Sequence, residues 1–303
     1  MMRHLLDIDD LTFEELNRVL VLAEKSNPPR ILNDKGVALL FEKPSSRTRS
    51  SAEIAVVQLG GHPMYITARE VGFDVRETAE DLARTLAGYH SVIGARVFSH
   101  GVLQRMAEAS TVPVVNLLSD LAHPLQALAD ALTLKSELGQ SGLEGRTLAY
   151  VGDSNNVARS LVLAAGAVGM TVRVASPSGY TFDAATVERF SQYGCDFTAL
   201  EDPAEAVKGA HAVYTDVWAS MGQEDQKEER RATFKDYTVD EKLMTQASPE
   251  AIFLHCLPAK RGYEVTDAVL DGPASRVWVQ SANRLHATRG FFLWLLEHNG
   301  FTS

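Results

Sequence analysis

Short apolar runs alternate along the first half of the chain with amphipathic stretches of helical length. The runs, rich in residues that favour β-strands, are residues 36–41, 62–66, 91–97 and 113–118. Strands that alternate with helices predict a parallel sheet with helices on both faces. In such a sheet ligands bind outside the carboxyl ends of the strands, so the residues that follow each run are the first candidates for a functional site.

A second series of the same kind follows a helical run at 124–139 and a Gly-rich segment at 139–145. Its apolar runs are residues 147–152, 171–176, 195–200, 210–217 and 251–257. The pattern predicts an α/β protein with two doubly wound parallel-sheet domains joined by long helices. We expect the domains to span 1–135 and 136–284, with a C-terminal helix, 285–303, that packs back on the first domain.

Two further segments have patterns of their own. Residues 1–20 are typical of a capped amphipathic helix. Residues 218–234 are long, polar and interrupted, and they predict a mobile loop rather than a strand or a core helix.

Composition narrows the class of protein. A chain of 303 residues favours two domains. The net charge of −10 disfavours a broad surface for nucleic acid or an anionic membrane. Without a signal-peptide core or an apolar run of about 18 residues, the chain is expected to be cytoplasmic. Its two cysteines, Cys195 and Cys256, are too few for a disulfide framework or a zinc cluster and are expected to be reduced.

A phosphate-binding pattern follows the first apolar run, where Ser45, Ser46, Arg47, Thr48 and Arg49 open a helix. Backbone N–H groups, hydroxyls and two guanidinium groups at a helix N-terminus suit a phosphate. A plain Ser N-cap with solvated arginines is the alternative. The glycine patterns of a P-loop and of a dinucleotide site are absent, which disfavours a nucleotide-dependent dehydrogenase.

The run K-P-S-S-R-T-R at 43–49 resembles the S-T-R-T-R phosphate signature of the aspartate and ornithine carbamoyltransferase family. Further segments match the family in order and spacing. They are GARVF with Arg96, HPLQALAD at 123–130, HCLPAKRG at 255–262 and NRLHA at 283–287, which is expected to start the last helix. Taken singly, His123 could cap a helix, Arg96 could be a surface charge and Cys256 a buried small side chain.

The resemblance implies a transferase that moves the carbamoyl group of carbamoyl phosphate to an amine without a metal or organic cofactor. It implies carbamoyl phosphate in the first domain, an amino-acid acceptor in the second, and a homotrimer or an assembly of trimers. The implied carbamoyl phosphate ligands are Ser45, Ser46, Arg47, Thr48, Arg96, His123, Gln126, Cys256, Leu257 and Arg284. Of these, Thr48, Arg96 and His123 would hold the carbonyl oxygen, and Gln126 and the Leu257 carbonyl would contact the amide nitrogen.

The acceptor pattern lies in the second domain. The segment D-x-x-x-S-M-G, from Asp216 to Gly222, resembles ornithine-specific members of the family. The implied ornithine ligands are Asn156, Asp216, Ser220 and Met221. Asp216 and Cys256 would position the δ-amine, and with Thr48, Arg96 and His123 they form the expected catalytic set.

Three alternatives stay open. The acceptor could be acetylornithine or putrescine, or the chain could be a catalytically silent paralogue that binds carbamoyl phosphate or a partner protein. Residues 72–83 lack the family's usual Q-x-G-R-G-E loop, so a contact of Gly72 with a neighbouring subunit's ligand stays unassigned.

Overall fold

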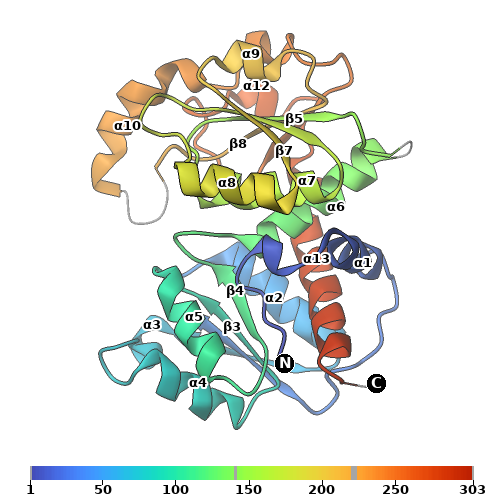
Figure 1. Ribbon diagram of the computed structural model, residues 1–303, viewed down its shortest axis with the longest axis vertical. Coiled ribbons are helices and arrows are strands. Elements are labelled where there is room, and N and C mark those ends of the chain that lie inside the picture. Colours follow the sequence, from blue (N-terminus) through green and yellow to red (C-terminus); the bar gives the residue numbers. More distant parts are fainter. Residues whose placement is uncertain (1, 140–141, 220–223, 302–303) are drawn as a thin grey trace. The chain divides into compact units, whose positions relative to one another are not determined.

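A computed structural model describes residues 2–139, 142–219 and 224–301. The chain forms two compact units, one comprising Met1–Ala129 and Asn283–Ser303 and the other Asp130–Ala282. Their limits lie within two long helices, α6 (Pro124–Leu138) and α13 (Val277–His298) (Figure 1).

Unit 1 contains a parallel sheet with the strand order β2-β1-β3-β4. The strands are β1 (Gly36–Phe41), β2 (His62–Thr67), β3 (Val92–Arg96) and β4 (Val114–Leu118). The helices before α6 are η1 (Ile8–Asp10), α1 (Phe13–Ala23), α2 (Ser46–Gln58), α3 (Ala68–Val71), α4 (Ala79–Ala87) and α5 (His100–Ala109). Helices α4 and α5 cover one face of the sheet, and α2 and α13 lie on the other (Figure 1). The strand order reverses between β1 and β3, which makes this pair a topological switch point.

Unit 2 contains a parallel sheet with the order β7-β6-β5-β8-β9. The strands are β5 (Thr147–Val151), β6 (Thr171–Ala175), β7 (Asp196–Leu200), β8 (Ala212–Thr215) and β9 (Ile252–His255). The helices are α7 (Asn156–Ala167), α8 (Ala184–Tyr193), α9 (Pro203–Val207), η3 (Glu224–Gln226), α10 (Lys227–Phe234), η4 (Lys235–Tyr237), α11 (Glu241–Met244) and α12 (Asp267–Leu270). Helices α7 and α8 cover one face and α9 and α12 the other (Figure 1). The switch point lies between β5 and β8, and the predicted fold of two doubly wound α/β parts is confirmed.

The prediction of one helix over residues 1–20 is wrong. Helix α1 begins at Phe13, where Thr12 and Glu15 form a capping box. Leu5 instead bonds to β4 through its backbone, donating to the Val114 carbonyl. Asp7 and Thr12 each cap a separate helical segment, so the chain changes direction between them.

Residues 218–234 are not a loop throughout, because Lys227–Phe234 forms α10. Arg230 and Phe234, four residues apart, are both buried on one face of this helix. Phe234 stacks on Trp218 with 5.9 Å between ring centroids. This packing offsets the low helical tendency of a very polar segment.

The last helix begins at Val277, six residues before the NRLHA motif that was expected to open it. Nothing between Val277 and Asn283 breaks a helix, and Pro273 lies just upstream. The C-terminal part of α13 packs in unit 1 as predicted, where Arg289 donates to the carbonyl oxygens of Ala23 and Lys25. Gly290 lies against Ala23 so closely that a Cβ would meet its backbone at 2.5 Å.

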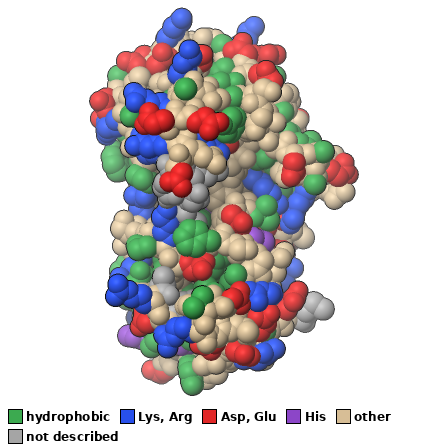
Figure 2. All heavy atoms as spheres, turned by 90° about the vertical axis from the view of Figure 1, so that its left-hand side faces the viewer, with side chains coloured by type: hydrophobic (Ala, Val, Ile, Leu, Met, Phe, Trp, Pro, Cys, Tyr) green, Lys and Arg blue, Asp and Glu red, His purple; other side chains and the backbone are tan. Residues whose placement is uncertain are grey.

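No helix among the described residues is both long and apolar enough to cross a membrane. On the face shown in Figure 2, Lys and Arg side chains alternate with Asp and Glu, and neither sign forms a broad patch.

Candidate active site

The switch point of unit 1 is lined by hydroxyl and guanidinium groups. Ser45 caps α2, and its Oγ accepts the Thr48 amide hydrogen at 3.4 Å. Thr48 is buried in the first turn of the helix and Arg96 ends β3. These residues lie at or after the carboxyl ends of the two strands between which the sheet order reverses, so the fold brings the first motif of the sequence next to the second.

Two guanidinium groups converge on the Thr48 hydroxyl. Arg96 Nη1 lies 3.5 Å from Thr48 Oγ1 and Arg284 Nη2 lies 3.3 Å from it. Arg284 is only 4% exposed, and its Nη1 donates to Gln126 Oε1 at 2.5 Å. Two cations held this close, with one of them buried, repel each other and favour an anion between them.

The remaining predicted residues of this cluster are also near it. Arg47 is half-buried in the first turn of α2, and its charge acts on His123. Ser46 is the first residue of α2 and is exposed. The free amide groups of this helix N-terminus add a partial positive charge to that of the guanidinium groups.

His123 immediately precedes α6 and is 5% exposed. Its carbonyl accepts the amide hydrogens of Gln126 and Ala127, so its backbone takes part in the start of the helix. Burial, followed by the charges of Arg284, Arg96 and Arg47, holds the pKa of the imidazole well below its ordinary value of 6.5. A neutral imidazole can donate a hydrogen bond to a carbonyl oxygen without adding a further charge.

We expect His123 to stay neutral when the pH falls through 6.5, because its lowered pKa puts protonation at a more acidic pH. The unfolded chain takes up this proton first, so His123 contributes to the loss of stability as the pH falls below 6.5. Histidine ¹⁵N NMR spectra of wild type and His123→Asn identify its signal. A signal that titrates at the ordinary value would contradict the buried, cation-flanked environment.

The switch point of unit 2 holds a carboxylate with two donors. Asp216 follows β8, is 5% exposed, and accepts a hydrogen bond from Asn155 Nδ2 at 3.0 Å. Cys256, which follows β9, donates its thiol hydrogen to the other oxygen at 3.1 Å. Asn155 also caps α7, because its Oδ1 accepts from the amides of Val157 and Ala158. The Asn155 side chain therefore fixes both the start of α7 and the Asp216 carboxylate.

The asparagine that contacts Asp216 is Asn155, whereas the sequence indicated its neighbour Asn156 as the ornithine ligand. Asn156 is the first residue of α7 and is half-buried. Its assignment stays a prediction, and Asn155 is the residue that holds Asp216. Ser220 and Met221, also expected near Asp216, lie outside the described residues.

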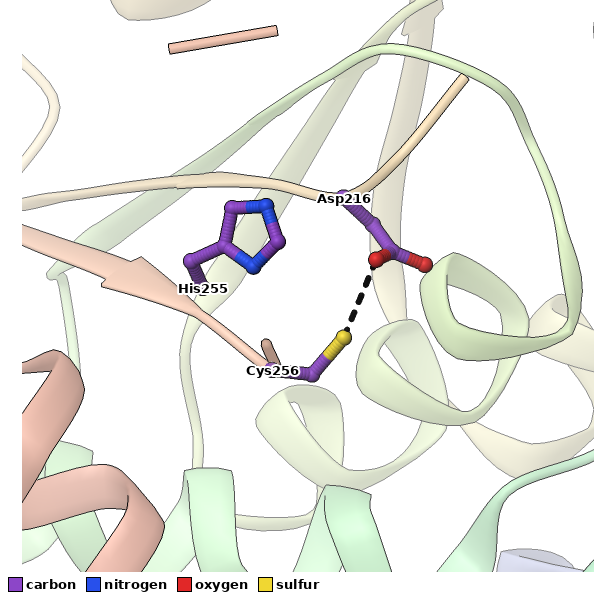
Figure 3. A group of neighbouring side chains, drawn as sticks. All are labelled: Asp216, His255 and Cys256. Carbon is purple, nitrogen blue, oxygen red and sulfur yellow. Dashed lines mark hydrogen bonds between the residues drawn. The ribbon is translucent and has the colours of Figure 1, made fainter. Parts of the chain in front are cut away.

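Figure 3 shows His255 at the end of β9, beside Asp216 and Cys256. One ligand atom from each residue lies within 4.8 Å of the others, so the group could in principle hold a metal ion. His255 Nδ1, however, accepts the Leu257 amide hydrogen at 2.8 Å, which assigns the ring proton to Nε2. Nε2 donates to the fully buried Glu264 at 3.3 Å. A metal would have to displace one of these bonds.

The His255 contact has a backbone consequence. Leu257 has φ +60° and precedes a cis proline, and this left-handed conformation is unfavourable for leucine. The bond to His255 holds the Leu257 peptide in place, and Glu264 in turn orients His255. Sequence patterns did not indicate these roles for Glu264, Arg230 and Asn155, although Glu264 follows the histidine of the HCLP motif by nine residues.

The cluster in unit 1 and the cluster in unit 2 suit different chemical groups. Unit 1 offers the guanidinium groups of Arg47, Arg96 and Arg284, a helix N-terminus and a neutral imidazole, which suit a phosphate joined to a carbonyl. Unit 2 offers a buried carboxylate with two donors, which suits an amine or an ammonium group. Leu257 and Cys256, assigned by resemblance to the carbamoyl group, lie in unit 2, and that assignment stays a prediction.

Comparison with known proteins agrees with this division. Residues 3–136 match the model of the aspartate/ornithine carbamoyltransferase carbamoyl-P binding domain, and residues 144–295 match that of the Asp/Orn binding domain. The anabolic ornithine carbamoyltransferase of Pyrococcus furiosus is 45% identical over 95% of this chain and 94% of its own. The ornithine carbamoyltransferase of Thermus thermophilus is 46% identical over 97% of each chain.

Solved structures give the same result. An ornithine carbamoyltransferase from Pyrococcus furiosus superimposes with a TM-score of 0.90, 44% identity and 96% coverage of both chains. An N-acetyl-L-ornithine transcarbamylase also matches, with a TM-score of 0.88 and 29% identity over 97% of this chain and 100% of its own. The chain, with the guanidinium cluster in one half and the buried carboxylate in the other, therefore belongs to the aspartate/ornithine carbamoyltransferase family.

Proposed function

We propose that the chain is an ornithine carbamoyltransferase, which converts carbamoyl phosphate and L-ornithine to L-citrulline and phosphate. The observation that carries this proposal is the convergence of Arg96 and Arg284 on the Thr48 hydroxyl, beside a neutral His123. The high identity to relatives that are named ornithine carbamoyltransferases supports the choice of reaction.

Carbamoyl phosphate is assigned to unit 1. Arg47, Arg284 and the amides at the start of α2 bind the phosphate, because its double negative charge is best matched by several cations and a helix N-terminus. Thr48, Arg96 and His123 donate to the carbonyl oxygen. Gln126 accepts from the carbamoyl amide nitrogen, and Ser45 and Ser46 complete the phosphate contacts.

The reaction is a displacement at the carbamoyl carbon. The lone pair of the ornithine δ-nitrogen forms the new C–N bond, and negative charge grows on the carbonyl oxygen as the tetrahedral species forms. The C–O bond to phosphate then breaks, and the phosphate leaves with that electron pair. Preorganised donors at the carbonyl oxygen lower the barrier, because they match charge that is larger in the transition state than in the substrate. The leaving phosphate accepts the proton lost by the amine.

Ornithine is assigned to unit 2. Asp216 binds the amino acid through its carboxylate, with Asn156, Ser220 and Met221 as further ligands. The δ-amine has an ordinary pKa of about 10.4, as in lysine, and attacks only as the neutral base. Cys256, hydrogen-bonded to Asp216, positions the amine and is not a covalent nucleophile, since the displacement needs no acyl-enzyme.

The setting of the reaction is proposed on family resemblance. The anabolic relative from Pyrococcus furiosus supports a role in arginine biosynthesis. We place the enzyme in the cytoplasm as a homotrimer or a larger assembly of trimers, and size-exclusion chromatography with light scattering tests the assembly.

A colorimetric assay for carbamoylated product tests the proposed function. The purified chain is incubated with carbamoyl phosphate and, separately, ornithine, acetylornithine, putrescine and aspartate. We expect product with ornithine and background with the other three. Acetylornithine deserves a separate reaction because a structural relative of this chain is named for that substrate. Product with a different acceptor would overturn the choice of substrate, and background with all four would favour a silent paralogue.

A further inference from the structure

Helix α10 carries a buried arginine that no step of the proposed reaction uses. Arg230 is 6% exposed, although the surrounding residues of this helix are charged and mostly exposed. A buried guanidinium group is costly unless its charge and its N–H groups are matched. Its neighbour Arg231 is exposed and lies over the ring of Tyr263, so the two arginines have different environments.

The contacts of Arg230 connect separate parts of unit 2. Nη1 donates to Asp153 Oδ2 at 2.7 Å and to the Trp218 carbonyl at 2.8 Å. Nε donates to Gln226 Oε1 at 3.2 Å, within the adjoining turn. The guanidinium carbon lies 4.9 Å from the centroid of the Tyr180 ring, close enough for a cation–π contact. One side chain therefore joins the end of β5, the segment after β8 and the segment after β6.

Two of these partners are close in sequence to the groups assigned to the acceptor. Asp153 is two residues before Asn155, which holds Asp216, and Trp218 is two residues after Asp216. Asp153 and Asp216 are also near enough that the Asp216 charge raises the pKa of Asp153. Burial raises that pKa more strongly, and the Arg230 charge opposes the shift. Without Arg230, the charges of these two buried carboxylates would repel each other with less cationic compensation.

We propose that Arg230 is a positioning residue for the acceptor amino acid. It holds the backbone just after Asp216 through the Trp218 carbonyl and pairs with Asp153, so that Asp216 is the carboxylate presented to the substrate. This inference rests on the proposed function, because it assigns the acceptor to Asp216. It predicts a specific loss of acceptor binding, since the contacts of Arg230 lie within unit 2 and the phosphate cluster lies in unit 1.

The test compares Arg230→Met and Arg230→Lys with Arg231→Met, a matched control on the same helix. Initial rates of citrulline formation are measured with each substrate varied in turn. Because the charge-assisted hydrogen bond to Asp153 and the bond to the Trp218 carbonyl are lost, we expect the ornithine KM of Arg230→Met to rise about tenfold or more. Arg230→Lys keeps the charge but lacks the planar guanidinium group, and its ornithine KM is expected to rise about threefold. The KM for carbamoyl phosphate should change less than about twofold in both, as should both constants in Arg231→Met.

Circular dichroism and thermal unfolding check that each variant folds. If Arg230→Met does not fold, Arg230→Lys and Asp153→Asn carry the test, because Asp153→Asn removes the charged partner and is expected to raise the ornithine KM as well. Equal changes in both KM values, or none in either, overturn the inference. Wild-type enzyme without ornithine turnover overturns the proposed function instead, so the two failures are distinguishable.

Discussion

Replacing Arg47 by alanine is expected to lower kcat/KM for citrulline formation by about 10²–10³-fold or more, because a cation that faces a developing dianion is lost. Arg47 lies in the first turn of α2, where its charge adds to the helix N-terminus and acts on the buried His123. Initial rates at several carbamoyl phosphate concentrations measure the effect. A fall in kcat at saturating substrate would show that Arg47 acts on the transition state as well as on binding.

Arg49→Ala is the matched control for this experiment. Arg49 lies on the same helix, pairs with Glu53 at 2.8 Å and sits over the ring of Tyr65 at 3.8 Å. It is exposed, so its removal should change kcat/KM less than about threefold, as for a surface ion pair. Comparable losses in both variants would mean that the overall charge of α2, rather than the position of Arg47, governs the rate.

The alternation of apolar and helical patterns was enough to predict the sheets. Each predicted run overlaps a strand of the structure. The central strands are buried on both faces and form continuous apolar runs, whereas the edge strands β2 and β7 are partly exposed and were indicated by their place in the alternation. The limits of helices were harder. Residues 1–20 and the start of α13 were misjudged because caps such as Thr12, and the distance from a breaker such as Pro273, decide where a helix begins.

The residues of unit 1 were predictable because strand ends meet at one edge of a parallel sheet. Thr48 and Arg96 follow strands that pair directly, so their proximity follows from the strand order. Arg284 is distant in sequence, and only the family motif indicated that it belongs with Thr48. Periodicity alone does not specify which side chain of a long helix reaches a given strand end.

The sequence did not indicate the roles of Asn155, Arg230 and Glu264, because each role depends on a contact with a residue that is distant in the chain or brought near by the fold. Asn155 and Asn156 are chemically identical, and the difference between them is that the first caps α7 while bonding to Asp216. Arg230 is in a stretch so rich in charge that its burial is not visible without the packing of Phe234 on Trp218. Burial of a single charged side chain is a tertiary property, which sequence patterns report poorly.

Replacing Asp216 by asparagine is expected to lower kcat/KM for ornithine by about 10²-fold or more, because a buried charge that pairs with the substrate amine is lost. The substitution is nearly isosteric, yet it replaces one acceptor oxygen by an NH₂ donor. Asn155 and Cys256 both donate to Asp216, so either orientation of the new amide turns a donor towards a donor. Rates with ornithine varied at saturating carbamoyl phosphate measure the loss.

The kinetic constants that change in Asp216→Asn show which substrate and which step Asp216 serves. If the carboxylate serves only the acceptor, the KM for carbamoyl phosphate in Asp216→Asn stays within about twofold of wild type, as for independent sites. Asp236→Asn is the control, since Asp236 is an exposed carboxylate of the same unit and its removal should leave both constants unchanged. A lower kcat at saturating ornithine would add a role in orienting the attacking nitrogen, because binding is then complete and only the reaction step is slowed. An unchanged ornithine KM and kcat would place the acceptor elsewhere, since a buried carboxylate cannot lose its charge beside a bound amine without cost.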